Sequence, residues 1–392
     1  MKNKIREEFP FLQQNTVFFD NSSTALKPKC VMDSICQYYE KNTSNAYRGS
    51  YENSEYVSMK LDETRELVAV FLNCLSSEVI FTGNCTDSIN QLTHMLNITK
   101  EDTIVCSVLE HHSNLLPWIE KTNVRIVDVL GDGTIDVDAI EQMLKEEKIK
   151  VVSVTGLSNV TGNIQPIKEI CEVAHRYGAI AIIDACQYAP HIEINVKDID
   201  CDFLALSGHK ICGPTGIGVI YGKKKLLAKC QKVKFGGGMV DKIADYDDIL
   251  YKDIPYCFEA GTPPIESIIG LGSAIKYLLE IGMDEIEKMN SELNECFKKH
   301  ISESGKIQMI FPISEKHAPI FTFKFKNNDI DMSYFAKILS DSANFCVASG
   351  YQCCQPLYKR YGEKGGMRVS LQFYNTVYEI ERFFEVINSL NI

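Results

Sequence analysis

The sequence predicts an α/β fold with a large domain on a mainly parallel sheet and a smaller α+β domain after it. The 392 residues exceed the roughly 250–300 at which a single hydrophobic core usually stops growing. Short apolar segments alternate with amphipathic helical segments through most of the chain, and this alternation ends after Gly261-Thr262-Pro263-Pro264. We expect a large domain over residues 15–284 and a small domain formed by residues 1–14 and 285–392.

The strands expected in the large domain are short runs rich in β-branched and aromatic residues, bounded by polar or turn-forming residues. The segments between them place apolar residues at helical spacing, and one opens with Pro166 and closes at Gly178. Strand–helix–strand repetition favours parallel pairing, because a helical crossover returns the chain in the same direction. The expected strands are 78–81, 103–106, 124–129, 151–155, 179–183 and 203–206, and the expected helices are 86–96, 136–145 and 166–177.

The carboxyl-terminal part has a different pattern, with long helices before a group of strands. Its last helix should begin at Thr376, because Glu379 three residues later completes a capping box. The apolar residues Ile380, Phe383, Phe384 and Ile387 then share one helix face. The expected helices are 265–279 and 283–300, and the expected strands are 319–326, 345–349 and 367–373.

Composition excludes several classes of function. The net charge of −11 argues against nucleic acid and anionic membranes as partners, since both need a basic surface. The fifteen cysteines are odd in number and have no repeated spacing, which favours a reducing cytoplasm over a disulfide framework. Paired metal-type cysteine motifs are absent, so no metal is expected. The first residues lack the apolar core of a signal peptide, and no apolar run is long enough for a membrane span.

Polar residues follow three of the expected strands, at the edge where open α/β sheets bind ligands. Lys210 lies among glycines after one strand, and Asp184 ends a second strand. A lysine can form a Schiff base with pyridoxal phosphate, and a carboxylate can stabilise its protonated ring nitrogen. The three segments are Asp184-Ala185-Cys186-Gln187, Ser207 to Gly218, and Gly156 to Gly162.

Seven motifs extend this pattern: FFDNSSTALKP, EHHSNLLPW, LSNVTG, IDACQ, SGHKICGPTGIG, FEAGTPP and RVSLQFYN. With them the chain resembles, over nearly its whole length, the class V, fold-type-I pyridoxal-phosphate enzymes, and within these the SufS-type cysteine desulfurases and selenocysteine lyases. The resemblance implies the fold-type-I transferase architecture, with a seven-stranded type of sheet. It also implies that Lys210 binds the cofactor covalently and transfers the substrate proton. By the same resemblance Asp184 pairs with the ring nitrogen, His111 lies on the ring face, and Asn159 and Gln187 contact the ring hydroxyl.

The cofactor phosphate is expected where a helix begins, because the first N–H groups of a helix are free to bind an anion. The expected phosphate contacts are Asn84, Cys85, Thr86, Ser207 and His209. The resemblance places Thr262 at the phosphate of a neighbouring subunit, which implies a homodimer with shared sites. Cys85 stands where the family usually has threonine, so one hydroxyl contact is lost.

Arg368 and Cys353 are the residues expected to act on the substrate. A guanidinium can hold an α-carboxylate, including that of L-cysteine, through two parallel hydrogen bonds. Aligned on Arg368, Cys353 falls on the family's nucleophile, which receives sulfur as a persulfide for a sulfur-acceptor protein. Its neighbour Cys354 is expected to pack inside, because adjacent residues of an extended loop point in opposite directions. His111 is the candidate for helping the thiol to ionise.

The segment from Ala348 to Arg368 resembles the short cysteine loop of the SufS-type branch, and not the longer loop of the IscS/NifS branch. Four positions nevertheless depart from the usual pattern, and the active-site mouth becomes less basic. Ala348 replaces an arginine, whereas Tyr51, Tyr351 and Gln352 replace histidines. The leading hypothesis is a cysteine desulfurase that forms alanine. The alternatives are a related C–S lyase or aminotransferase acting on a modified amino acid, and a non-catalytic sulfur-relay or scaffold protein on this fold.

Overall fold

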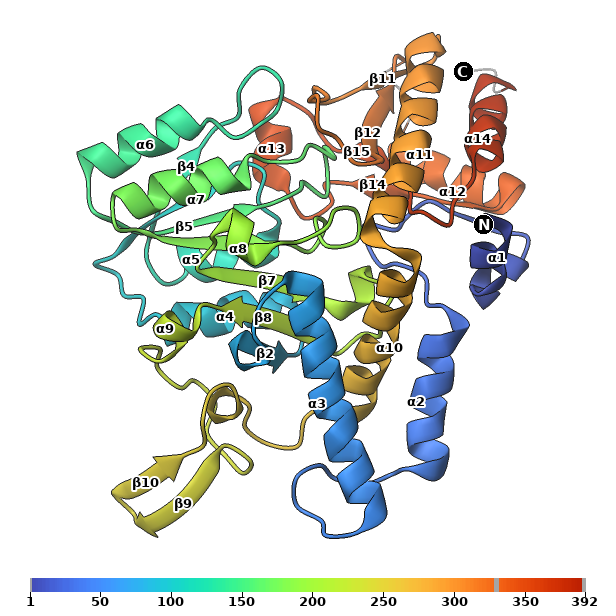
Figure 1. The fold of residues 1–392 in the computed structure, drawn as a ribbon. Helices are drawn as coiled ribbons and strands as arrows, with labels where there is room; N and C mark the ends of the chain where they lie inside the picture. Colours follow the sequence, from blue (N-terminus) through green and yellow to red (C-terminus); the bar gives the residue numbers. More distant parts are fainter. Residues whose placement is uncertain (1, 328–330, 390–392) are drawn as a thin grey trace.

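The computed structural model describes residues 2–327 and 331–389. Its centre is a sheet of seven strands in the order β2-β8-β7-β6-β5-β3-β4 (Figure 1). Strands β7, β6, β5, β3 and β4 run parallel, and β8 is antiparallel to both of its neighbours. The mainly parallel sheet is therefore confirmed. The strands are β2 (Val79–Thr82), β3 (Thr103–Ser107), β4 (Asn123–Val127), β5 (Ile149–Thr155), β6 (Ile180–Asp184), β7 (Phe203–Ser207) and β8 (Gly218–Gly222).

Six of these strands were predicted, with ends that differ by about two residues or less. Strand β8 was missed. It follows β7 without a helix between them, and two glycines, Gly218 and Gly222, bound its apolar residues. A strand of this kind falls outside the alternation of strands and α-helices by which the other strands were predicted.

Both faces of the sheet are covered, because successive side chains point to opposite sides. Ile182 belongs to one apolar cluster, which α4 (Cys85–Met95) and α5 (Leu116–Ile119) cover. Ile183 belongs to the opposite cluster, which includes α6 (Val137–Glu146) and α7 (Ile167–Arg176). This second cluster also contains the long helices α3 (Glu52–Leu72) and α10 (Ile265–Ile281).

The smaller part contains an antiparallel sheet in the order β11-β12-β15-β14. The predicted strand 345–349 divides into two: β13 (Phe345–Cys346) pairs with β1 (Val17–Phe18), and β14 (Ala348–Gly350) pairs with β15 (Gly366–Ser370). The capping box of α14 (Val377–Ser389) is confirmed, since Glu379 accepts from the Thr376 N–H at 2.9 Å. The predicted face of α14 is buried against α11 (Met283–Glu303) and the sheet strands β11 (Ile307–Met309) and β12 (Ile320–Phe325).

The amino-terminal segment contacts both parts of the molecule. Phe9 belongs to the cluster of the large sheet, whereas Phe19 belongs to the cluster of the small one. Arg6 forms an ion pair with Glu379 of α14 at 2.9 Å. The exact division between domains therefore stays a prediction.

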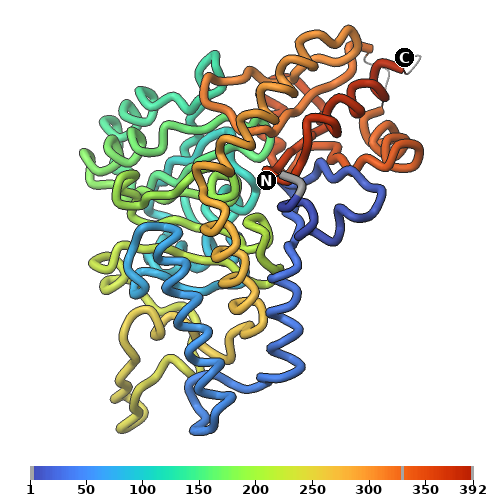
Figure 2. The backbone as a smooth tube through the Cα atoms, turned by 45° about the vertical axis from the view of Figure 1, so that its right-hand side comes forward, coloured from blue at the N-terminus to red at the C-terminus, as the bar shows by residue number. Residues whose placement is uncertain are grey.

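A two-stranded hairpin, β9 (Val240–Asp245) and β10 (Asp248–Tyr251), lies at the end of the molecule opposite the small domain (Figure 2). No helix of the described ranges combines the length and apolar composition needed to cross a bilayer. The remaining helices are α1 (Lys2–Glu7), α2 (Lys29–Lys41), α8 (Val196–Ile199), α9 (Lys224–Leu227), α12 (Met332–Ala343) and α13 (Gln355–Arg360), and the 3-10 turns are Pro10–Gln13, Ser76–Glu78, His112–Asn114, Gly208–Lys210 and Tyr256–Phe258.

Candidate active site

A cavity of about 530 Å³ opens at the carboxyl ends of β5, β6 and β7, where the two parts of the molecule meet. Its size suits a small organic ligand. With one exception, the residues proposed from the sequence as catalytic, cofactor-binding or substrate-binding all line it. They are Asn84, Cys85, Thr86, His111, Asn159, Asp184, Gln187, Ser207, His209, Lys210, Cys353 and Arg368.

The exception is Thr262. It is exposed and lines a separate cavity with the 3-10 turn that ends at Phe258. Thr262 does not line the 530 Å³ cavity of its own chain, so it is not placed to contact a phosphate bound there. The prediction that it serves a neighbouring subunit remains a proposal.

Lys210 and Asp184 reach the cavity from neighbouring parallel strands. Asp184 ends β6, is only 4% exposed, and accepts a hydrogen bond from the Cys186 N–H through Oδ1 at 2.9 Å. Its Oδ2 has no hydrogen bond within the described part of the chain. Lys210 ends the short 3-10 turn that follows β7. A buried carboxylate with one oxygen unpaired can pair with a protonated ring nitrogen, and the lysine supplies an amine nearby.

The beginning of α4 forms an anion-binding corner. The Asn84 side chain caps the helix by accepting from the Asp87 N–H at 2.9 Å, and Ser207 Oγ accepts from the Cys85 N–H at 2.8 Å. The Thr86 N–H makes no hydrogen bond to any described residue. A free N–H at the positive end of an 11-residue helix suits a phosphate group.

Gly218 makes this corner possible. A Cβ at this position would lie 2.6 Å from the Asn84 Cα, closer than side chains tolerate. Only glycine lets β8 approach the start of α4 so closely.

His111 is uncharged at neutral pH. Burial, and then the positive charge of Lys210, lower the pKa of His111 to about 4. Its Nδ1 accepts from the Ser113 N–H at 3.1 Å, so the neutral ring carries its proton on Nε2. A flat, neutral imidazole suits stacking on an aromatic ligand. Its proton-accepting nitrogen is already engaged, so a role in ionising Cys353 stays a prediction.

The side-chain amides of Gln187 and Asn159 line the cavity, and each NH₂ group donates one hydrogen bond within the protein. Gln187 Nε2 donates to the Ser22 carbonyl at 2.8 Å, and Asn159 Nδ2 donates to the Gln352 carbonyl at 2.9 Å. Each NH₂ group retains a second N–H for a ligand.

Arg368 reaches the cavity from β15 and is 3% exposed. One end of its guanidinium donates to the Asn159 carbonyl at 3.0 Å, and the other to Asp20 Oδ1 at 2.7 Å and Ser23 Oγ at 2.8 Å. Its Nε is buried and has no hydrogen-bond partner among residues 2–327 and 331–389. Asp20 belongs to the FFDNSSTALKP motif, which by itself predicted no role for this residue. Its carboxylate orients Arg368.

The two adjacent cysteines have opposite environments. Cys353 is exposed on the cavity, whereas Cys354 is fully buried and its Sγ lies 3.4 Å from the Leu109 carbonyl. The expected reason was wrong, because the loop is not extended: Gln352 and Cys353 have φ values of 43° and 56°. This tight, left-handed turn separates the two thiols.

The cysteine turn is bonded to the large domain as well as to its own sheet. The His112 N–H donates to the Cys353 carbonyl at 2.9 Å, which adds to the bond from Asn159 to Gln352. Gln352 Nε2 donates to the Gly366 carbonyl at 3.2 Å, and the Tyr358 hydroxyl bonds to Gln352 Oε1. Gln352, at a position where a histidine was expected, therefore stabilises the turn through its side-chain hydrogen bonds.

The other three residues that depart from the usual family pattern, Ala348, Tyr351 and Tyr51, differ in how close they lie to the cavity. Ala348 lines the cavity and pairs with Arg368 across the small sheet. Tyr351 is exposed and packs edge-on against Tyr358. Tyr51 is not among the residues that line the cavity, and its hydroxyl bonds to Ser44 at 3.0 Å.

Comparison with known proteins gives the family. The aminotransferase class-V model matches residues 17–383. The chain belongs to the class-V aminotransferase family. A curated relative from Halalkalibacterium halodurans, described as a probable cysteine desulfurase, is 38% identical over 97% of this chain and 95% of its own.

Solved structures agree with this class-V assignment. The apo structure of cysteine desulfurase from Thermococcus onnurineus NA1 has a TM-score of 0.92 and 32% identity, covering 98% of this chain and 96% of that one. The cysteine desulfurase CsdA from Escherichia coli has a TM-score of 0.91 and 27% identity, covering 99% and 98%. The expected fold class is thus confirmed.

Proposed function

We propose that this class-V protein is a pyridoxal-phosphate-dependent cysteine desulfurase that converts L-cysteine to L-alanine and carries the removed sulfur as a persulfide on Cys353. One observation carries the proposal: an exposed thiol shares a cavity with a lysine, a buried aspartate and a buried arginine. The curated relative and the two solved structures named above support the same reaction.

The cavity residues fit the cofactor. Asp184 offers an unpaired oxygen for a ring nitrogen, and Thr86 offers an unpaired N–H for the phosphate, beside Ser207 and His209. Lys210 would hold the aldehyde carbon, and the neutral ring of His111 would stack on the cofactor ring. When bound, pyridoxal phosphate supplies an electron sink that weakens bonds at the substrate α- and β-carbons.

The chain's own residues do the remaining work. Arg368 holds the substrate α-carboxylate, and Lys210 takes the α-proton once its amine is free. The Cys353 thiolate attacks the substrate sulfur, so an S–S bond forms and the Cβ–S bond breaks. The electron pair of that bond stays with the carbon fragment, which takes up a proton and leaves as alanine. The net change is cysteine plus a thiol giving alanine plus a persulfide.

We further propose a homodimer with shared sites, located in a reducing cytoplasm, that passes sulfur to an acceptor protein. The exposed Thr262, outside the cavity of its own chain, supports the shared sites. The fifteen free cysteines support a reducing compartment. Light scattering that finds an active monomer would contradict the shared sites.

The reaction can be tested by incubating the purified protein with L-cysteine and measuring alanine, pyruvate, sulfide and the mass of the Cys353 peptide. We expect alanine and a peptide heavier by one sulfur atom. Borohydride reduction should fix the cofactor to Lys210, and a label on Lys223 or Lys225 would contradict that assignment.

Three serine variants test whether Cys353 is the cysteine that receives the sulfur. Cys353→Ser should abolish the persulfide and most alanine formation, while cofactor binding is retained. Cys354→Ser and Cys36→Ser, at a buried neighbour and at another exposed cysteine, should retain most activity. Pyruvate as the main product, with full activity in Cys353→Ser, would favour the C–S lyase reaction instead.

A further inference from the structure

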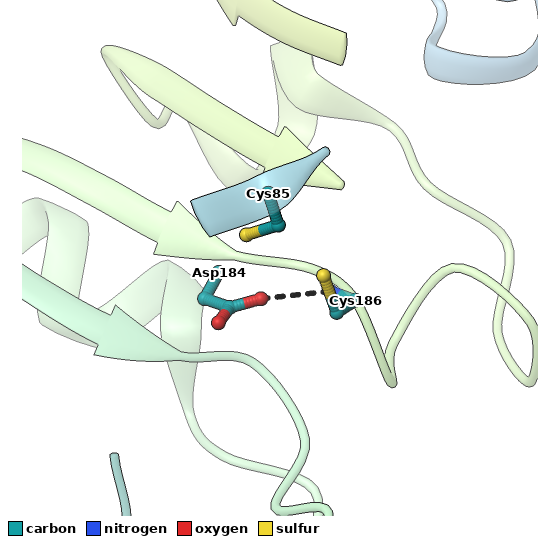
Figure 3. Close-up of side chains that lie close together, drawn as sticks. All are labelled: Cys85, Asp184 and Cys186. Atoms are coloured by element: carbon teal, nitrogen blue, oxygen red, sulfur yellow. Dashed lines mark hydrogen bonds between the residues drawn. The ribbon is translucent and has the colours of Figure 1, made fainter. Parts of the chain in front are cut away.

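Three metal-type side chains meet in the active-site cavity: Asp184 and Cys186, which are two residues apart, and Cys85, which lies about a hundred residues earlier in the sequence. The donor atoms of Cys85, Asp184 and Cys186 all lie within 4.8 Å of one another (Figure 3). All three are buried, with exposures of 3%, 4% and 6%. Figure 3 shows the Cys85 sulfur pointing toward Asp184. It is the single cluster of this kind among residues 2–327 and 331–389.

The proposed desulfurase reaction assigns no chemical step to either of the two thiols. Cys85 begins α4, and Cys186 lies two residues beyond the end of β6. Both are held beside Ser207, whose Oγ accepts from the Cys85 N–H at 2.8 Å and lies 3.7 Å from the Cys186 Sγ. Their positions are fixed by the same contacts that build the anion-binding corner.

The donor set suits a thiophilic divalent cation. Zinc binds thiolate sulfur at about 2.3 Å and carboxylate oxygen at about 2.0–2.2 Å, so donors in a tetrahedral site lie roughly 3.5–3.8 Å apart. Donor atoms within 4.8 Å therefore need only small rotations to meet a metal. Asp184 can contribute Oδ2 and keep the hydrogen bond from Cys186 to Oδ1. Three protein ligands leave a fourth position for water.

We propose that Cys85, Asp184 and Cys186 form a binding site for Zn²⁺ or Cd²⁺ in the cofactor-free protein, and that metal and cofactor exclude one another. The exclusion follows because both ligands use Asp184, and this half of the proposal rests on the proposed function. Metal binding itself requires only the three side chains. A site of this kind would make loading of the enzyme with cofactor sensitive to free thiophilic metal.

The test uses the full-length protein with its cofactor removed, titrated with Cd²⁺ and followed by the ultraviolet band of cadmium–thiolate bonds. We expect one tightly bound Cd²⁺ per chain. Cys85→Ser and Cys186→Ser should each raise the Kd by more than the roughly 10- to 100-fold that loss of an outer-shell partner causes. Circular dichroism checks that each variant is folded.

Two matched controls report on other thiols. Cys171→Ala removes a buried cysteine outside the cluster, and Cys36→Ser removes an exposed one, so neither should change the affinity. Unchanged binding in both Cys85→Ser and Cys186→Ser would overturn the site. If one variant does not fold, the other still decides.

Competition tests the second half of the proposal. Protein loaded with pyridoxal phosphate should show no tight Cd²⁺ binding, and Cd²⁺ should slow the uptake of cofactor followed by its absorbance. Equal Cd²⁺ affinity in loaded and cofactor-free protein would overturn mutual exclusion. Failure of the protein to bind pyridoxal phosphate at all would contradict the proposed function, and the metal titration would still decide the site.

Discussion

Replacing Arg368 by lysine tests how the active site recognises its substrate. The positive charge is kept, but the forked donor is lost. In the structure one end of the guanidinium holds the Asn159 carbonyl and the other holds Asp20 and Ser23. A single ammonium cannot serve both ends and a substrate carboxylate. Losing one charge-assisted hydrogen bond corresponds to about 1.5–3 kcal/mol.

That free energy corresponds to a fall of roughly 10- to 150-fold in kcat/KM for L-cysteine. The assay compares L-cysteine with cysteamine, which lacks the α-carboxylate, and quantifies transfer of sulfur to Cys353 from each. Discrimination between the two should shrink by the same factor, because only L-cysteine contacts Arg368 through a carboxylate. Equal losses for both compounds would refute carboxylate recognition and show that Arg368 acts by supporting the fold. Arg360→Lys, at an exposed helix position, serves as the control.

Three further predictions follow from buried groups and close contacts. Burial lowers the pKa of His191 to about 3, so the unfolded chain binds a proton first as the pH falls below about 6.5. His191 alone should therefore lower the unfolding free energy by up to about 2 kcal/mol between pH 7 and 5. The decrease should be smaller by that amount in His191→Asn than in the unmodified protein, and the same decrease in both would contradict this. Gly218→Ala should displace Asn84, destabilise the protein by about 1–3 kcal/mol and weaken cofactor binding. Gly131→Ala, where the added Cβ would lie in open space, should change neither the unfolding free energy nor the cofactor affinity, and both quantities are measured for each variant. Cys85→Thr should restore a hydroxyl to the anion-binding corner and tighten cofactor binding by roughly 2- to 10-fold in a titration, and weaker binding would contradict that role.

The elements with a clear period were predictable from the sequence. The strand that ends in Asp184 and the helix that ends before Gly178 have local patterns that tertiary packing did not override. Strand β8 and the divided strand 345–349 depend on partners elsewhere in the chain. Pairing between segments that are distant in the sequence produces little recognisable pattern within a short stretch of residues.

The residues that line the active-site cavity were largely predictable from the sequence, but the hydrogen bonds and other contacts between them were less so. Lys210 and Arg368 could be placed because motifs mark them. The bond from Arg368 to Asp20 joins residues 348 positions apart, and the meeting of Cys85 with Cys186 follows only from the sheet order. Metal-type spacing rules look for neighbours along the chain, so they missed this cluster.

Under the proposed function, the hydrogen bonds that hold the cysteine turn in place determine how sulfur can leave the protein. Bonds from His112 and Asn159 hold the main chain of this turn against the large domain, and Gln352 ties it to the small sheet. The persulfide proposed for Cys353 would therefore have only the reach of one side chain, since the main chain of the turn is held in place. Under the proposed function, an acceptor protein must therefore bring its own nucleophile into the cavity, to the exposed Cys353. Under the same proposal, only an acceptor with a segment narrow enough to enter this cavity of about 530 Å³ can take the sulfur.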